Sequence, residues 1–187
     1  MRQTMNVVKE KFGNQTIVGA EVGVANGHHA LNILQEMPNV KLLYLIDPYL
    51  GKIAWTDYDK TYVNEKKKAL VKTKLSQHSD RICWVYKEFE KCTVKDIPHS
   101  LDFIYIDGDH AYKHLIKDLA LASQLVKKSG VIGGHDAGCL SLEKAINEFC
   151  TKKQIERLNA PPGINNGSFN CNGTLKCQGW DWWMING

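Results

Sequence analysis

The stretch LDFIYIDGDHAY (101–112) places three ionisable side chains directly after an apolar run. Asp107, Asp109 and His110 follow six residues that are typical of a buried strand. Charged groups at the end of a buried strand destabilise a fold unless they are paired or are used in binding or catalysis. Carboxylates and imidazoles can remove a proton from a substrate, and carboxylates also hold hard divalent cations. The stretch therefore predicts one half of a functional site.

Apolar runs alternate with amphipathic segments along the chain. The expected strands are 16–22, 40–46, 82–86, 101–106 and 131–136, then a weak strand near 153–159 and an aromatic strand at 180–185. The expected helices include a lysine-rich segment that ends near 75, then 113–128, and 141–150 with a cap at Ser141. Continuous apolar strands separated by helices indicate a mostly parallel sheet with helices on both faces. The predicted fold class is α/β, a single doubly wound, Rossmann-like domain over residues 1–187.

The polar clusters of the chain all follow predicted strands. They are Glu21 to Gly27, Asp47, Lys87-Glu88, Asp107 to His110, and His135-Asp136. Ligands of doubly wound sheets bind beyond the carboxyl ends of the strands. We therefore expect these clusters to line one site.

The first strand-to-helix turn, EVGVANG (21–27), differs from the dinucleotide-binding pattern GxGxxG. Ala25 stands where the second glycine of that pattern lets a pyrophosphate approach the backbone, so the turn disfavours NAD or FAD. Gly23 and Gly27 still permit a sharp turn beside a ligand without phosphates. Asp47 ends the second strand, 26 residues after Glu21, where its carboxylate can accept both hydroxyls of a ribose. The combination favours a nucleoside-type ligand.

Several motifs together resemble the class I S-adenosylmethionine-dependent methyltransferases. They are AEVGVANGHHALNIL, LYLIDPY, the run from LDFIYIDGDHAY to GGHDA, and the closing WWMI. More narrowly, the chain is similar to the small O-methyltransferase-like family with IDGxHxY and GGxxxGHD motifs. The resemblance covers roughly residues 16 to 150 and the last strand. It implies a seven-stranded sheet with an antiparallel C-terminal strand and S-adenosyl-L-methionine as cofactor.

The resemblance also implies roles for individual residues. Glu21, Gly23 and Gly27 would line the methionine and ribose part of the cofactor, and Asp47 would hold the ribose hydroxyls. The remaining implied cofactor contacts are Glu88 and Phe89, which would flank the adenine, and Asp107. In metal-dependent relatives the ends of the fourth and fifth strands supply the ligands of Mg²⁺, which here would be Asp107, His135 and Asp136. An imidazole at His135 suits Mn²⁺, Fe²⁺ or Zn²⁺ better than Mg²⁺, so we leave the metal open.

Methyl transfer to an alcohol requires that the alcohol lose its proton to a base or be acidified by a cation. His110 and Asp109 are the candidate catalytic bases. His110 has the more suitable intrinsic pKa, whereas Asp109 would serve if a metal has already acidified the acceptor. Asp109 also has a purely structural alternative, since it can cap a helix that starts near Ala111. The expected function is O-methylation of a small hydroxylated or glycan-type acceptor, with or without a divalent cation.

Two other functions stay open on the sequence: an NAD-linked oxidoreductase, and a cofactor-binding scaffold without catalysis. Acceptor specificity is expected from the aromatic residues Trp55, Tyr58 and Tyr62 and from the loop 160–178. His28 and His29 open the first helix near the expected place of the cofactor carboxylate, which one of them could hydrogen-bond, but we expect them to be exposed residues of a first helical turn. The tryptophans Trp180, Trp182 and Trp183 are expected to pack in the core and at the sheet edge. The pocket is expected to be open or to be completed by a second subunit in a homodimer.

Composition narrows the environment of the protein. The 187 residues carry a net charge of +4, which comes almost wholly from lysine, and this argues against a nucleic-acid surface rich in arginine. No apolar run approaches the ~20 residues of a membrane span, and the N-terminus lacks the apolar core of a signal peptide. We therefore predict a cytoplasmic protein whose six cysteines stay reduced. Cys171 and Cys177 could form a disulfide or bind a metal ion, but the five residues between them do not favour either link.

Overall fold

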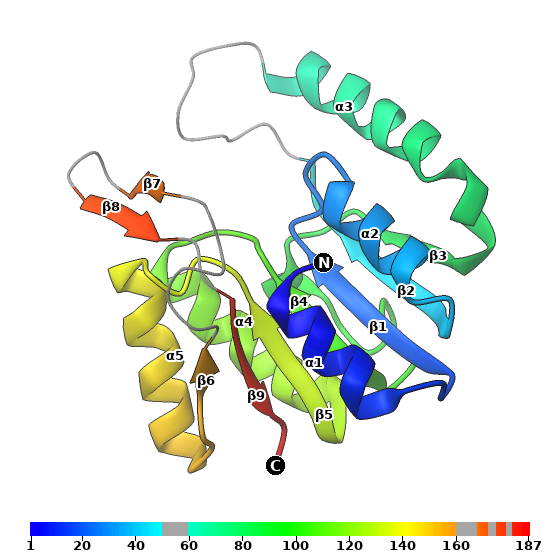
Figure 1. The fold of residues 1–187 in the computed structure, drawn as a ribbon. Helices are drawn as coiled ribbons and strands as arrows, with labels where there is room; N and C mark the ends of the chain where they lie inside the picture. Colours follow the sequence, from blue (N-terminus) through cyan, green and yellow to red (C-terminus); the bar gives the residue numbers. More distant parts are fainter. Residues whose placement is uncertain (50–59, 160–167, 172–174, 179–180) are drawn as a thin grey trace.

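The computed structural model describes the backbone of residues 1–49, 60–159, 168–171, 175–178 and 181–187, and the side chains of 1–49, 65–158 and 181–187. The helices are α1 (Gln3–Phe12), α2 (His28–Glu36), α3 (Lys60–Lys74), α4 (Tyr112–Leu125), α5 (Leu140–Lys153) and the short 3₁₀ turns η1 (Ser76–Arg81) and η2 (Phe89–Lys91). The strands are β1 (Ile17–Val22), β2 (Val40–Ile46), β3 (Ile82–Val85), β4 (Leu101–Ile106), β5 (Val126–Gly134), β6 (Leu158–Asn159), β7 (Ser168–Cys171), β8 (Leu175–Gln178) and β9 (Trp182–Ile185). Figure 1 shows their arrangement.

The main sheet has seven strands in the order β3-β2-β1-β4-β5-β9-β6. The pairs among β1 to β5 are parallel, and β9 runs antiparallel to both β5 and β6. The chain reverses its direction of progress across the sheet between β1 and β4, which is where doubly wound folds bind ligands. The predicted fold class is confirmed.

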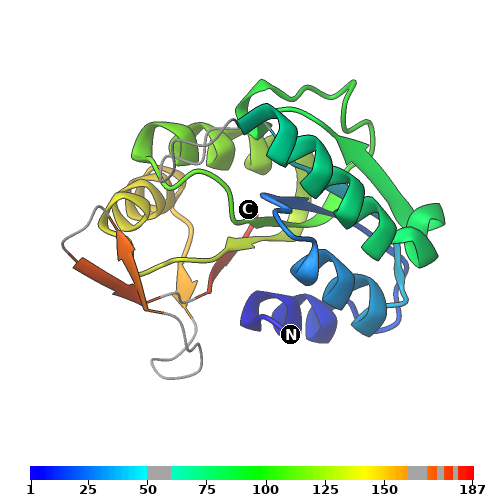
Figure 2. The ribbon, with the colours of Figure 1, turned by 90° about the horizontal axis from the view of Figure 1, so that it is seen from above.

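Alternating side chains of the strands form two separate cores. On one face Val22, Ile104 and Ile106 pack with apolar residues of α4 and α5. On the other face Phe103 and Tyr105 pack with apolar residues of α1, α2 and α3. Figure 2 shows the sheet between α1 and α2 on one side and α4 and α5 on the other. Because side chains alternate along a strand, polar residues in register with Tyr105 face α1 and α2.

Helix α1 docks closely on the sheet, although the sequence did not predict it. Gly133 makes the approach possible, because a Cβ at this position would lie 2.5 Å from Thr4 Cγ2. The Thr4 backbone N–H donates to Asp181 Oδ2 at 2.9 Å, and the Thr4 hydroxyl donates to the Trp182 carbonyl at 3.2 Å. Met5 and Val8 are fully buried beneath the helix. The N-terminal segment is therefore fixed to the start of β9.

Several predicted boundaries need correction. Helix α4 ends at Leu125 and β5 starts at Val126, so residues predicted as the end of a helix form the start of a strand. The register of β4 with β5 shifts after Leu101, because β5 carries extra residues there. Helix α5 extends to Lys153, and of the strand predicted near 153–159 only Leu158–Asn159 form β6. Strands β7 and β8 pair antiparallel inside the segment predicted as a loop.

Two smaller predictions have clear outcomes. Trp182 and Trp183 are buried, as predicted for core and edge packing, whereas Trp180 lies outside the described residues. Cys139 is disulfide-bonded, so the prediction that all six cysteines stay reduced is wrong; the side chains of Cys171 and Cys177 are not among those described.

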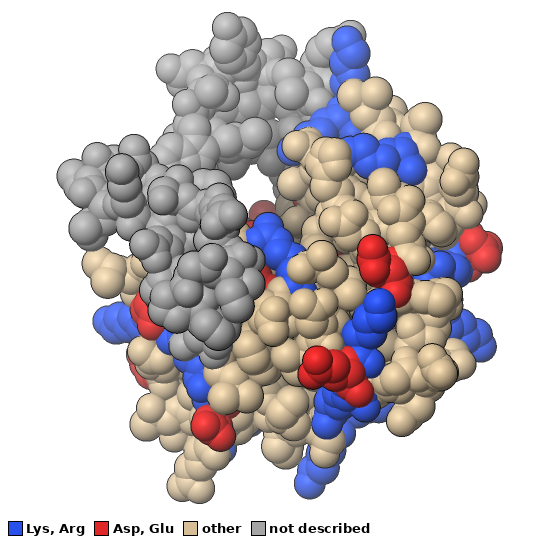
Figure 3. Space-filling view, in the orientation of Figure 1, with Lys and Arg blue, Asp and Glu red and all other residues tan. Residues whose placement is uncertain are grey.

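The face of the molecule in Figure 3 carries both positive and negative side chains. The described helices are too short or too polar to cross a membrane. On the face in Figure 3, Lys and Arg side chains alternate with Asp and Glu side chains and form no continuous basic patch. An ion pair between Lys9 and Glu36, with 3.8 Å between Nζ and Oε2, is an example. Within the described part of the chain no helix could cross a bilayer.

Candidate active site

The glycine turn after β1 is built against the end of β4. Gly23 has φ +84°, a conformation that side chains rarely adopt, and a Cβ on it would lie 2.0 Å from the Asp107 carbonyl oxygen. The Gly23 N–H donates to the Ile46 carbonyl, and the Asp107 N–H donates to the Val22 carbonyl. The turn after β1 and the end of β4 therefore share one surface, on which a ligand could contact both backbones.

Asp47 is oriented by backbone amides at the end of β2. Its Oδ2 accepts the Ala25 N–H at 2.9 Å, and its Oδ1 accepts the Tyr49 N–H at 2.8 Å. The Tyr49 hydroxyl donates to the Ala25 carbonyl at 3.3 Å, so the segment after β2 is bonded to the turn after β1. Each carboxylate oxygen can accept a further hydrogen bond, so the geometry leaves Asp47 able to bind the two hydroxyls of a ribose.

Gly27 and Phe89 have packing roles in the structure. Gly27 precedes α2 with φ +67°, and a Cβ there would lie 2.6 Å from Val71 Cγ1 on α3. Phe89 is 3% exposed and belongs to the core under α4. Glu88 is more exposed, and its Oε2 pairs with Lys91 Nζ at 2.7 Å. Of the two residues predicted to flank the adenine, Phe89 is therefore a buried ring and Glu88 is a surface carboxylate.

Three side chains converge at the ends of β4 and β5. Ligand-type atoms of Asp107, His110 and Asp136 all lie within 4.8 Å of one another, and they form the one such group with three members among the described residues. His110 Nε2 lies 2.9 Å from Asp136 Oδ2. The Asp107 side chain is 27% exposed and that of His110 is 45% exposed, so the group is open to a ligand. Two carboxylates and an imidazole form a donor set that suits a divalent cation.

His135 lies beside this group and not within it. Its side chain is 6% exposed, and its Nδ1 is 2.9 Å from Asp136 Oδ1, on the opposite oxygen from His110. The set that the structure groups therefore differs from the predicted ligand set Asp107, His135 and Asp136 by the exchange of His135 for His110. The exchange was not predictable from spacing, because Asp136 adopts φ +59°, an uncommon value for a residue other than glycine.

Burial and neighbouring charges shift the pKa values of the group in opposite directions. Burial raises the pKa of Asp107, and the nearby Asp136 adds to this rise. Burial also acts to raise the pKa of Asp136, but contacts with His110 and His135 outweigh it and hold that pKa below its usual range. The hydrogen bond to Asp136 raises the pKa of His110. Asp136 is therefore the ionised member, and His110 is a stronger base than an isolated imidazole.

Asp109 and Ser141 shape the segment that carries His110. Asp109 Oδ1 accepts the Ala111 N–H at 2.8 Å. Ala111 is itself the N-cap of α4, so Asp109 stabilises the turn before the helix and does not cap it, contrary to the structural alternative expected from the sequence. The Asp109 side chain is 64% exposed and lies next to His110 in the chain. Ser141 does not cap α5, whose first flanking residue is Cys139; its hydroxyl donates to the His110 carbonyl at 2.7 Å.

A buried polar cluster on the α1 face was missed by sequence reasoning. His29 was expected to be exposed, but its side chain is 12% exposed and its ring lies against Tyr105, with 4.2 Å between centroids. The Tyr105 hydroxyl donates to Asp181 Oδ1 at 3.0 Å. Arg2 lies 3.8 Å from both Asp181 Oδ1 and Asp107 Oδ2. A partial signal existed in the sequence: Tyr105 and Asp107 are two residues apart and must point to the same face.

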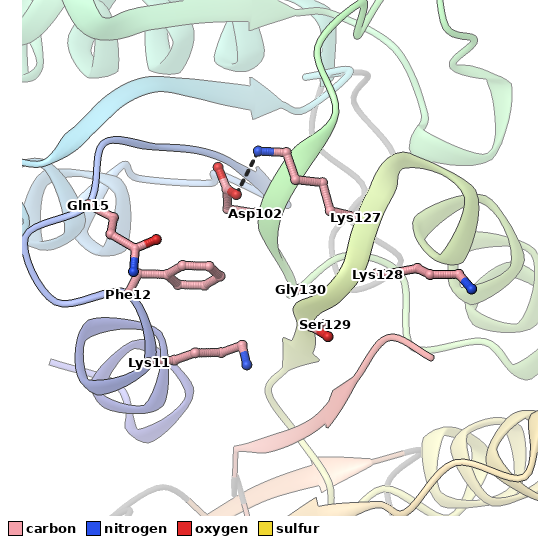
Figure 4. A pocket seen from close by; sticks show the side chains of 8 residues that line it. All are labelled: Lys11, Phe12, Gln15, Asp102, Lys127, Lys128, Ser129 and Gly130. Atoms are coloured by element: carbon pink, nitrogen blue, oxygen red, sulfur yellow. Dashed lines mark hydrogen bonds and ion pairs between the residues drawn. The ribbon is translucent and has the colours of Figure 1, made fainter.

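A separate cavity of about 320 Å³ lies at the opposite end of the sheet. It is lined by Lys11 and Phe12 of α1 and by the start of β5, and Figure 4 shows Lys127 and Asp102, which also line it, joined to one another. Lys127 Nζ and Asp102 Oδ1 are 2.8 Å apart. The cavity lies at the amino ends of the parallel strands, away from the Asp107 group, and we assign it no part in the chemistry.

The strand order and the polar groups at the carboxyl ends define a class I methyltransferase fold. The sequence profile of a family described as a methyltransferase domain matches residues 20–137. This match covers more than half of the chain, so the protein belongs to that methyltransferase family.

Solved structures agree on the fold. The N-methyltransferase NodS from Bradyrhizobium japonicum is 14% identical with a TM-score of 0.63, covering 98% of this chain and 92% of that one. A precorrin-6y methyltransferase from Geobacter metallireducens is 16% identical with a TM-score of 0.66, covering 97% and 86%. An S-adenosylmethionine-dependent O-methyltransferase from Thermotoga maritima is 7% identical with a TM-score of 0.62, covering 98% and 64%. At these identities the likeness concerns the fold alone, and no curated protein matches the sequence.

Proposed function

We propose that the protein transfers the methyl group of S-adenosyl-L-methionine to a hydroxyl of a small hydroxylated or sugar-type acceptor. One observation carries the proposal: Asp107, His110 and Asp136 converge beside the glycine turn, with ligand-type atoms within 4.8 Å of one another. A neutral amine attacks a sulfonium without help, whereas an alcohol must first lose its proton. A group built to remove or acidify a proton therefore favours an oxygen acceptor.

Asp107, His110 and Asp136 would hold a divalent cation. The partial exposure of Asp107 and His110 leaves room for an acceptor oxygen beside them. Such a cation, when bound, supplies Lewis acidity that lowers the pKa of an acceptor hydroxyl. Asp109 is then the base that takes the hydroxyl proton, because its carboxylate is exposed and it precedes His110 directly in the chain.

A reaction without metal is the second candidate, and the short contact between His110 and Asp136 favours it. His110 Nε2 lies 2.9 Å from Asp136 Oδ2, so in the tautomer with its proton on Nε2 the ring has Nδ1 free to receive the proton of the acceptor. Asp136 then orients the ring and stabilises its protonated form, as carboxylates do for catalytic histidines. Both candidates use Asp136, but they differ in their response to chelation.

The acceptor class follows from aromatic residues that the sequence places after the second strand. Trp55, Tyr58 and Tyr62, on which the expectation of specificity rests, lie outside the described side chains, as does the segment 160–178 apart from the backbone of β7 and β8. Aromatic side chains near the strand ends would suit a sugar or an aromatic alcohol. A homodimer and a cytoplasmic location are also proposals, and the disulfide of Cys139 opposes the second, because cytoplasmic thiols are usually kept reduced.

Transfer of a labelled methyl group to a panel of sugars and phenols tests the proposal. We expect product with an oxygen-linked methyl group, and loss of turnover when the protein is treated with a chelator and recovery with Mn²⁺ or Mg²⁺. Turnover that survives chelation selects the His110–Asp136 base. An Asp80→Asn variant, which changes an exposed carboxylate far from the group, serves as the control. Transfer only to amines would contradict the proposed acceptor class.

The two alternative functions, an NAD-linked oxidoreductase and a non-catalytic scaffold, can be distinguished from a methyltransferase. Membership of a methyltransferase family and Ala25 in the glycine turn both disfavour an NAD-linked oxidoreductase. A non-catalytic scaffold would bind S-adenosylhomocysteine but transfer no methyl group to any acceptor. Unchanged turnover of a working acceptor in both Asp107→Ala and Asp136→Ala would remove the catalytic role of the group.

A further inference from the structure

Arg2 is held at the carboxyl edge of the sheet by the start of α1. Its carbonyl accepts the N–H groups of Met5 at 3.0 Å and Asn6 at 3.2 Å, as the residue before a helix does. The Thr4 N–H binds the fully buried Asp181, which fixes the same turn to β9. The Arg2 side chain is thereby brought beside Asp107, at the end of β4.

The Arg2 guanidinium is charged but has no hydrogen bond to a described residue. Its two ion pairs, with Asp107 Oδ2 and Asp181 Oδ1, are each 3.8 Å long, which exceeds hydrogen-bond length. Arg81 shows the contrast, since it donates to three backbone carbonyls at 2.8 to 2.9 Å. A guanidinium has five N–H donors in a planar fork that matches a carboxylate. Arg2 is therefore placed in the site without a hydrogen bond from its guanidinium to any residue that the structure describes.

Unused polar atoms also lie next to Arg2, on the same face of the sheet. Glu21 is 2% exposed, and its Oε2 is buried without a hydrogen-bond partner. Both ring nitrogens of His29 are buried without a partner, and Nδ1 is 3.7 Å from Glu21 Oε1, too far for a hydrogen bond. Buried polar atoms without partners are costly, so this face of the sheet carries polar groups that the described residues leave unsatisfied beside Arg2.

We propose that Arg2 binds the carboxylate of the amino-acid end of S-adenosylmethionine, next to Glu21, which the family resemblance already implies at the methionine part of the cofactor. This inference rests on the proposed function. Glu21 and Asp107 flank the glycine turn, so the ammonium and the sulfonium of the cofactor meet carboxylates there. The single carboxylate of the cofactor needs a cationic partner in this acidic surrounding, and Arg2 supplies one. Cofactor recognition thus depends on helix α1, whose first turn presents Arg2.

Calorimetric titration with two matched ligands tests the inference. S-adenosylhomocysteine carries the carboxylate, and decarboxylated S-adenosylhomocysteine keeps the adenosine, sulfur and ammonium but lacks it. For Arg2→Gln we expect the affinity for S-adenosylhomocysteine to fall about 10-fold or more, since charged hydrogen bonds are strong, and the affinity for the decarboxylated ligand to change by less than about 2-fold. Arg2→Lys should restore part of the preference. Lys11→Gln removes a charge from the exposed far end of the same helix and should change neither affinity.

The ratio of the two affinities separates recognition from folding. If Arg2 only stabilised α1, Arg2→Gln would weaken both ligands alike, and this result would overturn the inference. Unchanged affinity for S-adenosylhomocysteine in Arg2→Gln would overturn it as well. If the folded wild-type protein bound neither ligand, the proposed function itself would fail.

Discussion

The imidazole of His110 and the carboxylate of Asp136 are joined by a 2.9 Å contact between Nε2 and Oδ2. The two residues come from different segments, one after β4 and the other after β5. Asp136 holds its position with an uncommon positive φ, and its second oxygen is 2.9 Å from His135 Nδ1. The carboxylate is therefore fixed between two imidazoles, and it can either orient a base or bind a cation.

Asp136→Asn keeps the shape of the Asp136 side chain but removes its negative charge, so it tests the effect of that charge on His110. Because the hydrogen bond to Asp136 raises the pKa of His110, its loss lowers that pKa. A histidine base works only when deprotonated, so activity is lost as the pH falls through its pKa. We expect the acidic limb of the pH–rate profile to move to lower pH, and the maximal rate to fall on the order of 100-fold or more. The pH dependence of methyl transfer measures both, and an unmoved acidic limb would rule out His110 as the base.

Gly23→Ala should abolish cofactor binding because of its close contact with the end of β4. A Cβ at Gly23 would lie 2.0 Å from the Asp107 carbonyl oxygen, which forces the two backbones apart. Gly13→Ala is the matched control: Gly13 also has a positive φ, +51°, but nothing lies within 4 Å of its added Cβ. The control should cost about 1–3 kcal/mol of stability from backbone strain alone and leave cofactor affinity intact. Equal affinity for S-adenosylhomocysteine in both variants would contradict the proposed cofactor position.

Asp118→Asn should stabilise the protein at alkaline pH. Burial raises the pKa of Asp118 to about 7, and the negative charge of Glu90 adds to this effect, while His114 and Lys117 partly oppose it. Because the folded-state pKa exceeds the unfolded one, the folded state binds more protons between about pH 4 and 7. Stability therefore falls as the pH rises through this range, by on the order of 3 kcal/mol, and stays low above it.

Chemical denaturation at pH 5 and pH 8 measures this effect. The free energy of unfolding of Asp118→Asn should exceed that of the wild type clearly at pH 8 and much less at pH 5. Asp80→Asn, at an exposed carboxylate, should change little at either pH. An Asp118→Asn variant that is no more stable at pH 8 would show that the carboxyl group is compensated in the folded state.

The sheet was predictable because its strands are buried on both sides. Runs such as LDFIYI are almost continuously apolar, which is typical of buried parallel strands. Asp47 and Asp107 directly follow two of these runs in the sequence, so their place at the strand ends was predictable as well. Helix α1 was missed because it carries only a narrow apolar stripe, chiefly Met5 and Val8. Its position depends on the missing side chain of Gly133 and on the bond between Thr4 and Asp181, which are contacts between distant parts of the chain.

The composition of the site was harder to predict than its location. The sequence placed two histidines near Asp136, but which of them joins Asp107 depends on the backbone at Asp136 and on the hydrogen bond from Ser141 to the His110 carbonyl. Neither has a signature in the sequence. Arg2 lies 105 residues from Asp107 in the chain, so only the folded structure brings their charges together.

A crystal structure of the complex with S-adenosylhomocysteine would show whether the cofactor lies beside the group of Asp107, His110 and Asp136. We expect the ligand on the Gly23 turn, with its ribose hydroxyls donating to Asp47 and its sulfur facing that group. A ligand bound elsewhere, or one whose sulfur points away from the group, would overturn the proposed active site.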